Sequence, residues 1–164
     1  MGDVWVVNAS PVITLAKAGY LQLFDQLSPE ILIPKPVVDE ILAGPSEDPA
    51  KKAIESGWGK VVTPGPTPGV ILEWGVGAGE SSVLALSLSE AGRTAVLDDA
   101  AARSCARALG VSFLGTLAVV LRAKHAGLVE SAVSVMRALK QVGFRLDDRT
   151  LRTALEQINE TWPG

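Results

Sequence analysis

Residues 3–11 read DVWVVNASP, and this stretch sets the class of the fold. Its first part is a short, valine-rich apolar run, which is typical of a strand buried on both faces of a parallel sheet. Ser10 and Pro11 follow at once, and this pair is typical of the first turn of a helix. We therefore expect a buried strand and then a helix that Ser10 caps and that ends at Gly19.

The same alternation of apolar runs and helical patterns continues along the sequence. It predicts a parallel sheet with helices on both faces, a three-layer α/β/α fold with about four to five strands. The segment 64–79 is rich in proline and glycine and is expected to be a loop. The expected strands are 3–8, 31–33, 60–63, 94–98 and 111–114, and the expected helices are 12–19, 20–27, 34–44, 49–56, 80–91, 99–109, 116–126, 130–142 and 148–160.

Length and composition exclude several classes of protein. The 164 residues fit one domain, so we expect a single domain over 1–164 with a C-terminal helical extension over 128–164. A hydrophobic fraction of 48% excludes a disordered chain, and a single cysteine excludes a disulfide framework. No apolar run reaches the roughly 18 residues that a membrane helix needs, so we expect a soluble cytoplasmic protein without a membrane partner.

The charge balance bears on nucleic-acid binding. The formal net charge is −3, whereas proteins that attract nucleic acid through their overall field are usually basic. Binding to RNA would therefore need a local basic patch or metal ions. Arg103, Arg122 and Lys124 are the candidates for RNA contact, although such residues on helices are also typical of ordinary solvated faces.

Polar residues follow the expected strands where a site would form. Asn8 ends the first strand, and Asp98 and Asp99 end the fourth; Glu40 and Glu80 lie on the helices 34–44 and 80–91. In open α/β sheets, sites form beyond the carboxyl ends of the strands. Carboxylates gathered there would repel one another unless a cation lay among them. Mg²⁺ and Mn²⁺ suit such oxygen ligands and support phosphodiester hydrolysis by activating water.

Each of these residues also has a simpler interpretation. Asp98 or Asp99 could cap the following helix, although only one of the two can do so. Glu80 could complement the dipole of its helix, and Glu40 could be a solvated surface charge. Asn8 could be a turn residue. The case for a site therefore depends on whether these side chains converge.

Five segments together resemble the PIN-domain family, the fold of VapC-type toxin ribonucleases, and in particular its DUF3368 subfamily of predicted nucleic acid-binding proteins. The resemblance implies a parallel sheet, an acidic metal-binding pocket and Mg²⁺- or Mn²⁺-dependent ribonuclease activity, often in a toxin–antitoxin pair. It also implies an RNA substrate, a cognate antitoxin and a homodimer. The segments are VVNASPVITLAKAG, EILIPKPVVDEIL, GAGESSVLALSL, AVLDDAAARSCARALGV and GTLAVVLRAKHAGLV.

The resemblance places a catalytic pocket at particular positions of this sequence. It implies Glu40, Glu80 and Asp99 as metal ligands, with Asn8 completing the pocket and Asp98 adjacent. Most PIN nucleases have aspartate where this chain has asparagine, which removes one negative charge and should lower the affinity for metal. The resemblance further implies Ser10 and Thr116 as polar supports.

Three functions follow from these observations. The first is a metal-dependent endoribonuclease that acts as the toxin of a toxin–antitoxin pair. The second is a weakly active or inactive PIN-like module that binds RNA or a protein, which the neutral Asn8 favours. The third is a receiver-type signalling domain with Asp98 and Asp99 as the phosphoacceptor pocket. The third is the weakest, because receivers carry their acidic pair after the first strand.

Overall fold

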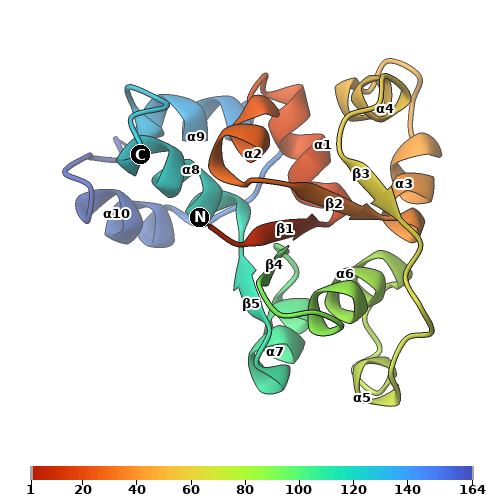
Figure 1. Cartoon of the computed structure of the whole chain (residues 1–164). Coiled ribbons are helices and arrows are strands. Elements are labelled where there is room, and N and C mark those ends of the chain that lie inside the picture. The colour runs from red at the N-terminus through yellow and green to blue at the C-terminus, as the bar shows by residue number, and fades with distance from the viewer. Residues whose placement is uncertain (1, 164) are drawn as a thin grey trace.

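The computed structural model describes residues 2–163, and within them five parallel strands form a sheet in the order β3-β2-β1-β4-β5 (Figure 1). The central pairing aligns Val7 of β1 with Val96 of β4. The expected three-layer fold with a parallel sheet is confirmed. The strands are β1 (Val4–Val7), β2 (Ile31–Pro34), β3 (Lys60–Val62), β4 (Arg93–Val96) and β5 (Ser112–Leu114).

Helices cover both faces of this sheet. Helices α6 and α7 lie on one side, and α1, α2, α8 and α9 lie on the other (Figure 1). None of the described helices is both long enough and apolar enough to span a bilayer. The helices are α1 (Ala9–Lys17), α2 (Gln22–Leu27), α3 (Lys35–Leu42), α4 (Pro49–Glu55), α5 (Gly69–Leu72), α6 (Ala78–Leu88), α7 (Ala100–Leu109), α8 (Thr116–His125), α9 (Ala132–Gln141) and α10 (Asp148–Glu156).

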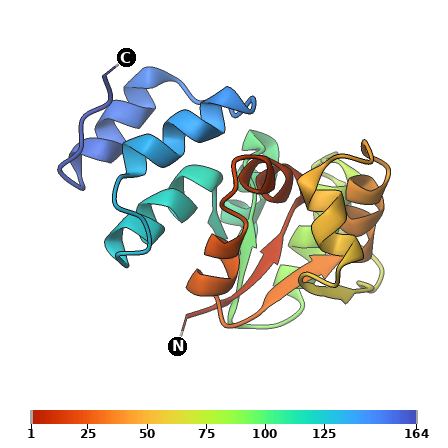
Figure 2. The ribbon, with the colours of Figure 1, turned by 90° about the horizontal axis from the view of Figure 1, so that it is seen from above.

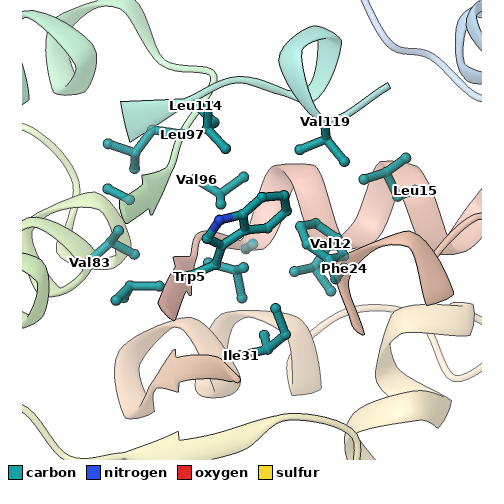
Figure 3. Close-up of a cluster of buried hydrophobic side chains, with 14 of the residues drawn as sticks. Trp5, Val12, Leu15, Phe24, Ile31, Val83, Val96, Leu97, Leu114 and Val119 are labelled. Carbon is teal, nitrogen blue, oxygen red and sulfur yellow. The ribbon is translucent and has the colours of Figure 1, made fainter. Parts of the chain in front are cut away.

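The core is built mainly from aliphatic side chains around a few aromatic rings. Trp5 of β1 lies among residues from the sheet and from the helices on its α1 side (Figure 3). Its ring meets Phe24 edge to face, with 6.1 Å between ring centroids, and Phe24 in turn contacts Trp58. Since these contacts bury the centre of β1, they fix the strand whose carboxyl end carries Asn8.

The turn from β1 into α1 differs from the expectation. The structure places Asn8, not Ser10, at the N-cap of α1, with extended backbone angles (φ −89°, ψ 164°). The strand ends at Val7, so one residue makes the whole turn. Pro11 still fits the first turn of the helix, because the first four N–H groups of a helix have no partner within it. Ser10 is exposed in that turn.

Most other boundaries differ from the expectation by one to three residues, and two regions differ more. The expected loop 64–79 contains the single-turn helix α5, which buries Ile71, and also the first residues of α6. The last helix ends at Glu156 instead of residue 160, and Asn159 has a positive φ of 60°. The chain turns back at this point, which brings Glu160 against the start of α9.

Helices α9 and α10 lie beside α8, on the opposite side of α8 from α3 and α4 (Figure 2). The carboxylate of Glu160 accepts hydrogen bonds from the N–H groups of Ala132 (2.9 Å) and Val133 (3.0 Å) and from the Ser131 hydroxyl. Burial raises the pKa of Glu160, but these hydrogen bonds outweigh it, so the pKa lies below its ordinary value. The ionised carboxylate therefore holds residue 160 on the first turn of α9.

Candidate functional site

The centre of the sheet has a topological switch point. The chain moves from β1 to β2 in one direction, whereas β4 lies on the other side of β1. The N–H of Asn8 donates to the carbonyl oxygen of Val96 (3.2 Å), so the carboxyl ends of β1 and β4 are joined. Strand β4 ends at Val96, two residues before the expected end, so Asp98 and Asp99 follow it after Leu97. Ligands of open α/β proteins bind in the crevice at such a point.

Asn8 brings an unusual oxygen atom to this crevice. The residue is only 4% exposed, and its Oδ1 accepts no hydrogen bond from residues 2–163. A side chain at Gly79 would begin 3.2 Å from this oxygen and 3.8 Å from Oε1 of Glu40. The absence of a side chain at Gly79 therefore lets α6 approach both oxygens closely. An unsatisfied buried carbonyl costs about 1–3 kcal/mol, so a ligand bound to this oxygen would offset that cost.

The two glutamates reach this region from neighbouring helices. Glu40 is exposed in the second turn of α3, which packs against α6, and its carboxylate reaches Gly79. Glu80 is the third residue of α6 and is half-buried. Its Oε2 lies over the helix start, 2.6 Å from where a side chain at Gly77 would begin. A carboxylate there suits the helix dipole, so the position of Glu80 at the start of α6 is explained without a ligand role.

Asp98 has a structural partner across the sheet edge. Its Oδ1 accepts the backbone N–H of Thr116 (2.8 Å), and its Oδ2 accepts the hydroxyl of Thr116 (2.6 Å). Thr116 is completely buried at the start of α8. A side chain at Gly115 would begin 3.0 Å from Oδ1 of Asp98, so a glycine allows this close approach. The two hydrogen bonds hold the Asp98 carboxylate in one orientation.

Asp99 is the N-cap of α7. Its Oδ2 accepts the N–H of Ala102 (2.9 Å), and its side chain is exposed. Of the two adjacent aspartates, Asp99 therefore caps the helix and Asp98 does not. A carboxylate has about four lone-pair sites, so one capping bond leaves Asp99 able to accept a further ligand.

Comparison with protein families agrees with this architecture. A family model described as a PIN domain, DUF3368, matches residues 4–160. The chain belongs to the PIN-domain family. The matched region includes α9 and most of the segment after α10. No match is found among curated proteins.

The oxygen atoms at the switch point of this PIN domain have the chemistry that Mg²⁺ or Mn²⁺ requires. Asn8 supplies a buried carbonyl oxygen without a partner, and Glu40 supplies a carboxylate beside it. Within residues 2–163, however, no three His, Cys, Asp or Glu side chains gather closely enough to hold one ion. An ion here would combine the Asn8 oxygen with carboxylates and water, a mixture that Mg²⁺ readily accepts.

The three basic candidates of the PIN domain lie in different places. Arg103 is in the second turn of α7, near the crevice, with its guanidinium carbon 5.3 Å from the centroid of the Phe113 ring. Arg122 and Lys124 lie in the last turn of α8, far along that helix from the sheet edge. The ammonium of Lys124 donates to the carbonyl oxygen of Glu130 and pairs with Glu160.

Sequence reasoning missed two glycines that shape the site. Segment 75–79 predicts only a flexible turn, yet Gly79 is buried in α6 between Asn8 and Glu40. Gly115 likewise lets Thr116 approach Asp98. The available signal was the position of each glycine, since both directly precede a polar residue that is a candidate for the site.

Proposed function

We propose that this PIN-domain protein is a metal-dependent endoribonuclease that hydrolyses RNA phosphodiester bonds, and that it is the toxin of a toxin–antitoxin pair. One observation carries the proposal. The buried Oδ1 of Asn8 lacks a partner within the described residues, and Gly79 lies close to both this oxygen and the Glu40 carboxylate. A divalent cation with its bound water would satisfy both oxygens at the point where α/β folds bind ligands.

The proposed roles follow from the position of each residue. Asn8, Glu40 and Asp99 supply oxygen ligands, and Glu80 adds negative charge from the start of α6. A divalent metal held by these oxygens would supply an activated water and positive charge for phosphodiester hydrolysis. Asp98, held by both hydrogen bonds from Thr116, orients the loop that carries Asp99.

A second candidate function is a PIN-like module that binds RNA or protein without cleaving it. The neutral Asn8 favours it, because the site then has one carboxylate fewer at its most buried position. The other functions of the two aspartates also favour it, since Asp98 binds Thr116 and Asp99 caps α7. These hydrogen bonds explain both aspartates without a metal.

Calorimetry with Mn²⁺ and an RNA-cleavage assay separate the two functions. We would compare the natural protein with Asp99→Asn, which removes the charge but keeps a good N-cap. The matched control is Asp147→Asn, because Asp147 caps α10 through the same kind of bond to Thr150. Loss of Mn²⁺ binding and cleavage in Asp99→Asn alone supports the nuclease. RNA cleavage that survives Asp99→Asn contradicts the roles proposed here.

The toxin role also implies two protein partners. One is a second copy of this chain, which would form a homodimer, and the other is an antitoxin. The support for this role is a set of exposed apolar side chains, with Val61 on the edge strand β3 and with Val70, Leu72 and Trp74 on or just after α5. Strand β3 forms one edge of the sheet and pairs only with β2 within the described residues. Surfaces of this kind commonly mark interfaces. Sedimentation of the natural protein and of Leu72→Lys tests the dimer, which the variant should dissociate.

A further inference from the structure

A cavity of about 240 Å³ lies beside Asp98, between the start of α8 and the segment that joins α9 to α10. Asp98 lines it from the segment after β4, Arg103 lines it from near the start of α7, and Leu117 lines it from α8. Phe144 and Arg145 line it from the joining segment. The C-terminal helices thus contribute a wall to a hollow that adjoins the candidate site.

Two arginines and one carboxylate, Asp98, line this cavity, and both oxygens of Asp98 accept hydrogen bonds from Thr116. Neither Arg103 nor Arg145 forms an ion pair with any residue from 2 to 163. Arg103 is held against the ring of Phe113, whereas Arg145 is exposed. Nearby Lys140 differs, because it donates to Asp148 (3.1 Å) and lies over the ring of Trp162. The two arginines therefore have no ion-pair partner within the described residues and can bind an anion.

The cavity between the two arginines is apolar and small. Leu117, Leu121 and Phe144 contribute to its lining, and its volume is below the roughly 300 Å³ at which drug-sized pockets begin. A planar group of the size of one nucleobase fits such a space and can pack against an aromatic ring. A second, more open hollow continues from Phe144 and Arg145 toward Lys140. Together they form a path that leads away from Asp98.

From this arrangement we infer that the cavity is a subsite for one unpaired nucleotide of an RNA strand. The base packs against Phe144, and Arg103 and Arg145 bind the flanking phosphates. The inference rests on the proposed function for the identity of the substrate, and it adds a nucleotide-binding role for the segment between α9 and α10. The chain carries a net charge of −3, so such paired local cations are what an RNA strand would need.

The test measures RNA binding separately from RNA cleavage. Fluorescence anisotropy of a short unstructured oligoribonucleotide is recorded with the full chain, once with EDTA to measure binding alone and once with Mn²⁺, and a gel of each sample reports whether the RNA is cleaved. Arg145→Gln should weaken binding about fivefold at 0.1 M salt and reduce the salt slope by about 0.7, the effect of one lost phosphate contact on a single strand. Arg149→Gln, an exposed arginine of α10 outside the cavity, is the matched control.

A second variant addresses the base. Phe144→Leu keeps an apolar side chain against the core, and it should weaken binding about fivefold or more by removing one stacked base. Thermal melts confirm that each variant is folded. A blunt duplex of the same sequence should bind less tightly than the single strand, because the cavity takes a single base.

The outcomes distinguish this inference from the proposed function. Selective weakening by Arg145→Gln and Phe144→Leu without any RNA cleavage supports the subsite and contradicts the nuclease. Equal binding by Arg145→Gln, Arg149→Gln and the natural protein overturns the subsite, even if the protein cleaves RNA. Absence of RNA binding overturns it as well and leaves an apolar peptide as the occupant to examine.

Discussion

Asn8 is the residue on which the proposed function chiefly depends. It is neutral and buried, and its carbonyl oxygen lacks a partner within the described residues. A carboxylate at this position would be a stronger ligand, but without a cation it would be an uncompensated buried charge beside Glu40. Under the proposed function, the asparagine would therefore lower metal affinity and stabilise the metal-free fold.

These two effects of the asparagine predict the behaviour of Asn8→Asp. Without divalent metal, the variant should lose about 2 kcal/mol of stability, which corresponds to roughly 4–8 °C in Tm. With Mn²⁺, its Tm should rise by more than that of the natural protein. Differential scanning calorimetry in EDTA and in Mn²⁺ measures both effects. An equal response of the two proteins to Mn²⁺ would show that Asn8 is not a ligand.

The hydroxyl of Thr116 permits a second prediction. Thr116→Val removes the 2.6 Å hydrogen bond to Asp98 and keeps the volume of the side chain. Since hydrogen bonds to charged groups contribute about 1.5–3 kcal/mol, the variant should be less stable by about 2 kcal/mol. Denaturant unfolding measures the loss. Thr116→Ser retains the hydroxyl and should lose less; equal losses would point to packing as the cause.

Individual residues of the site differ in how far the sequence could predict them. Asn8 and Glu40 both lie beside Gly79, because strand ends and the following helices meet at one edge of a parallel sheet. The adjacent aspartates predict one N-cap, and Asp99 is that cap. The partner of Asp98 could not be predicted from local pattern, since Thr116 lies 18 positions away on another element. The metal roles of Glu40, Glu80 and Asp99 remain predictions.

Among the elements, α9 depends on a carboxylate from outside itself. Glu160 supplies it, and the pKa of that group lies below its ordinary value. A lowered pKa means that the folded state favours the ionised form. The resulting stability is present above the ordinary pKa of glutamate, about 4.3, and is lost as pH falls through the lower pKa of the folded state.

Glu160→Gln should therefore destabilise the protein in a pH-dependent way. At pH 7 the variant should unfold at a lower denaturant concentration than the natural protein. The difference should shrink below pH 4.3 and disappear once Glu160 of the natural protein is protonated. Glu156→Gln, at an exposed position of α10, is the control and should show little difference. A difference that is constant from pH 7 to pH 3 would contradict the charged cap.

Element boundaries were predicted less well than the elements themselves. Apolar periodicity locates a helix, but its ends depend on where neighbouring elements stop. Ser10 has the composition of an N-cap, yet β1 ends at Val7 and leaves Asn8 to make the turn. The last helix stops at Glu156, because the chain must reverse for Glu160 to reach α9. Tertiary contacts settled both ends.

For the whole molecule, alternating strands and helices predicted a parallel sheet but did not by themselves give the order of its strands. Local apolar patterns do not determine which strands become neighbours in the sheet. Here β1 pairs with β4 across most of the sequence, and the Thr94 hydroxyl donates to Asp3, 91 positions earlier. This long-range pairing creates the switch point, and hence the site.

Metal binding should be visible in the stability of the molecule as a whole. If the folded state alone binds Mn²⁺, a concentration a hundredfold above Kd adds about 2.7 kcal/mol of stability. For a chain of this size the Tm should rise by roughly 5–10 °C. Thermal melts across an Mn²⁺ titration measure the shift, which Asp99→Asn should abolish and Asp147→Asn should retain. A Tm that does not depend on Mn²⁺ would favour the module without metal.

The pairing of β1 with β4 also has a consequence for synthesis on the ribosome. Asn8 and Glu40 emerge early, whereas β4 and Thr116 are made much later. At about 5–20 residues per second, roughly 5–20 s pass between the synthesis of β1 and the synthesis of β4. During this interval the nascent chain holds only half of the crevice. The complete site can therefore assemble only late in translation, after most of the polypeptide has already left the exit tunnel.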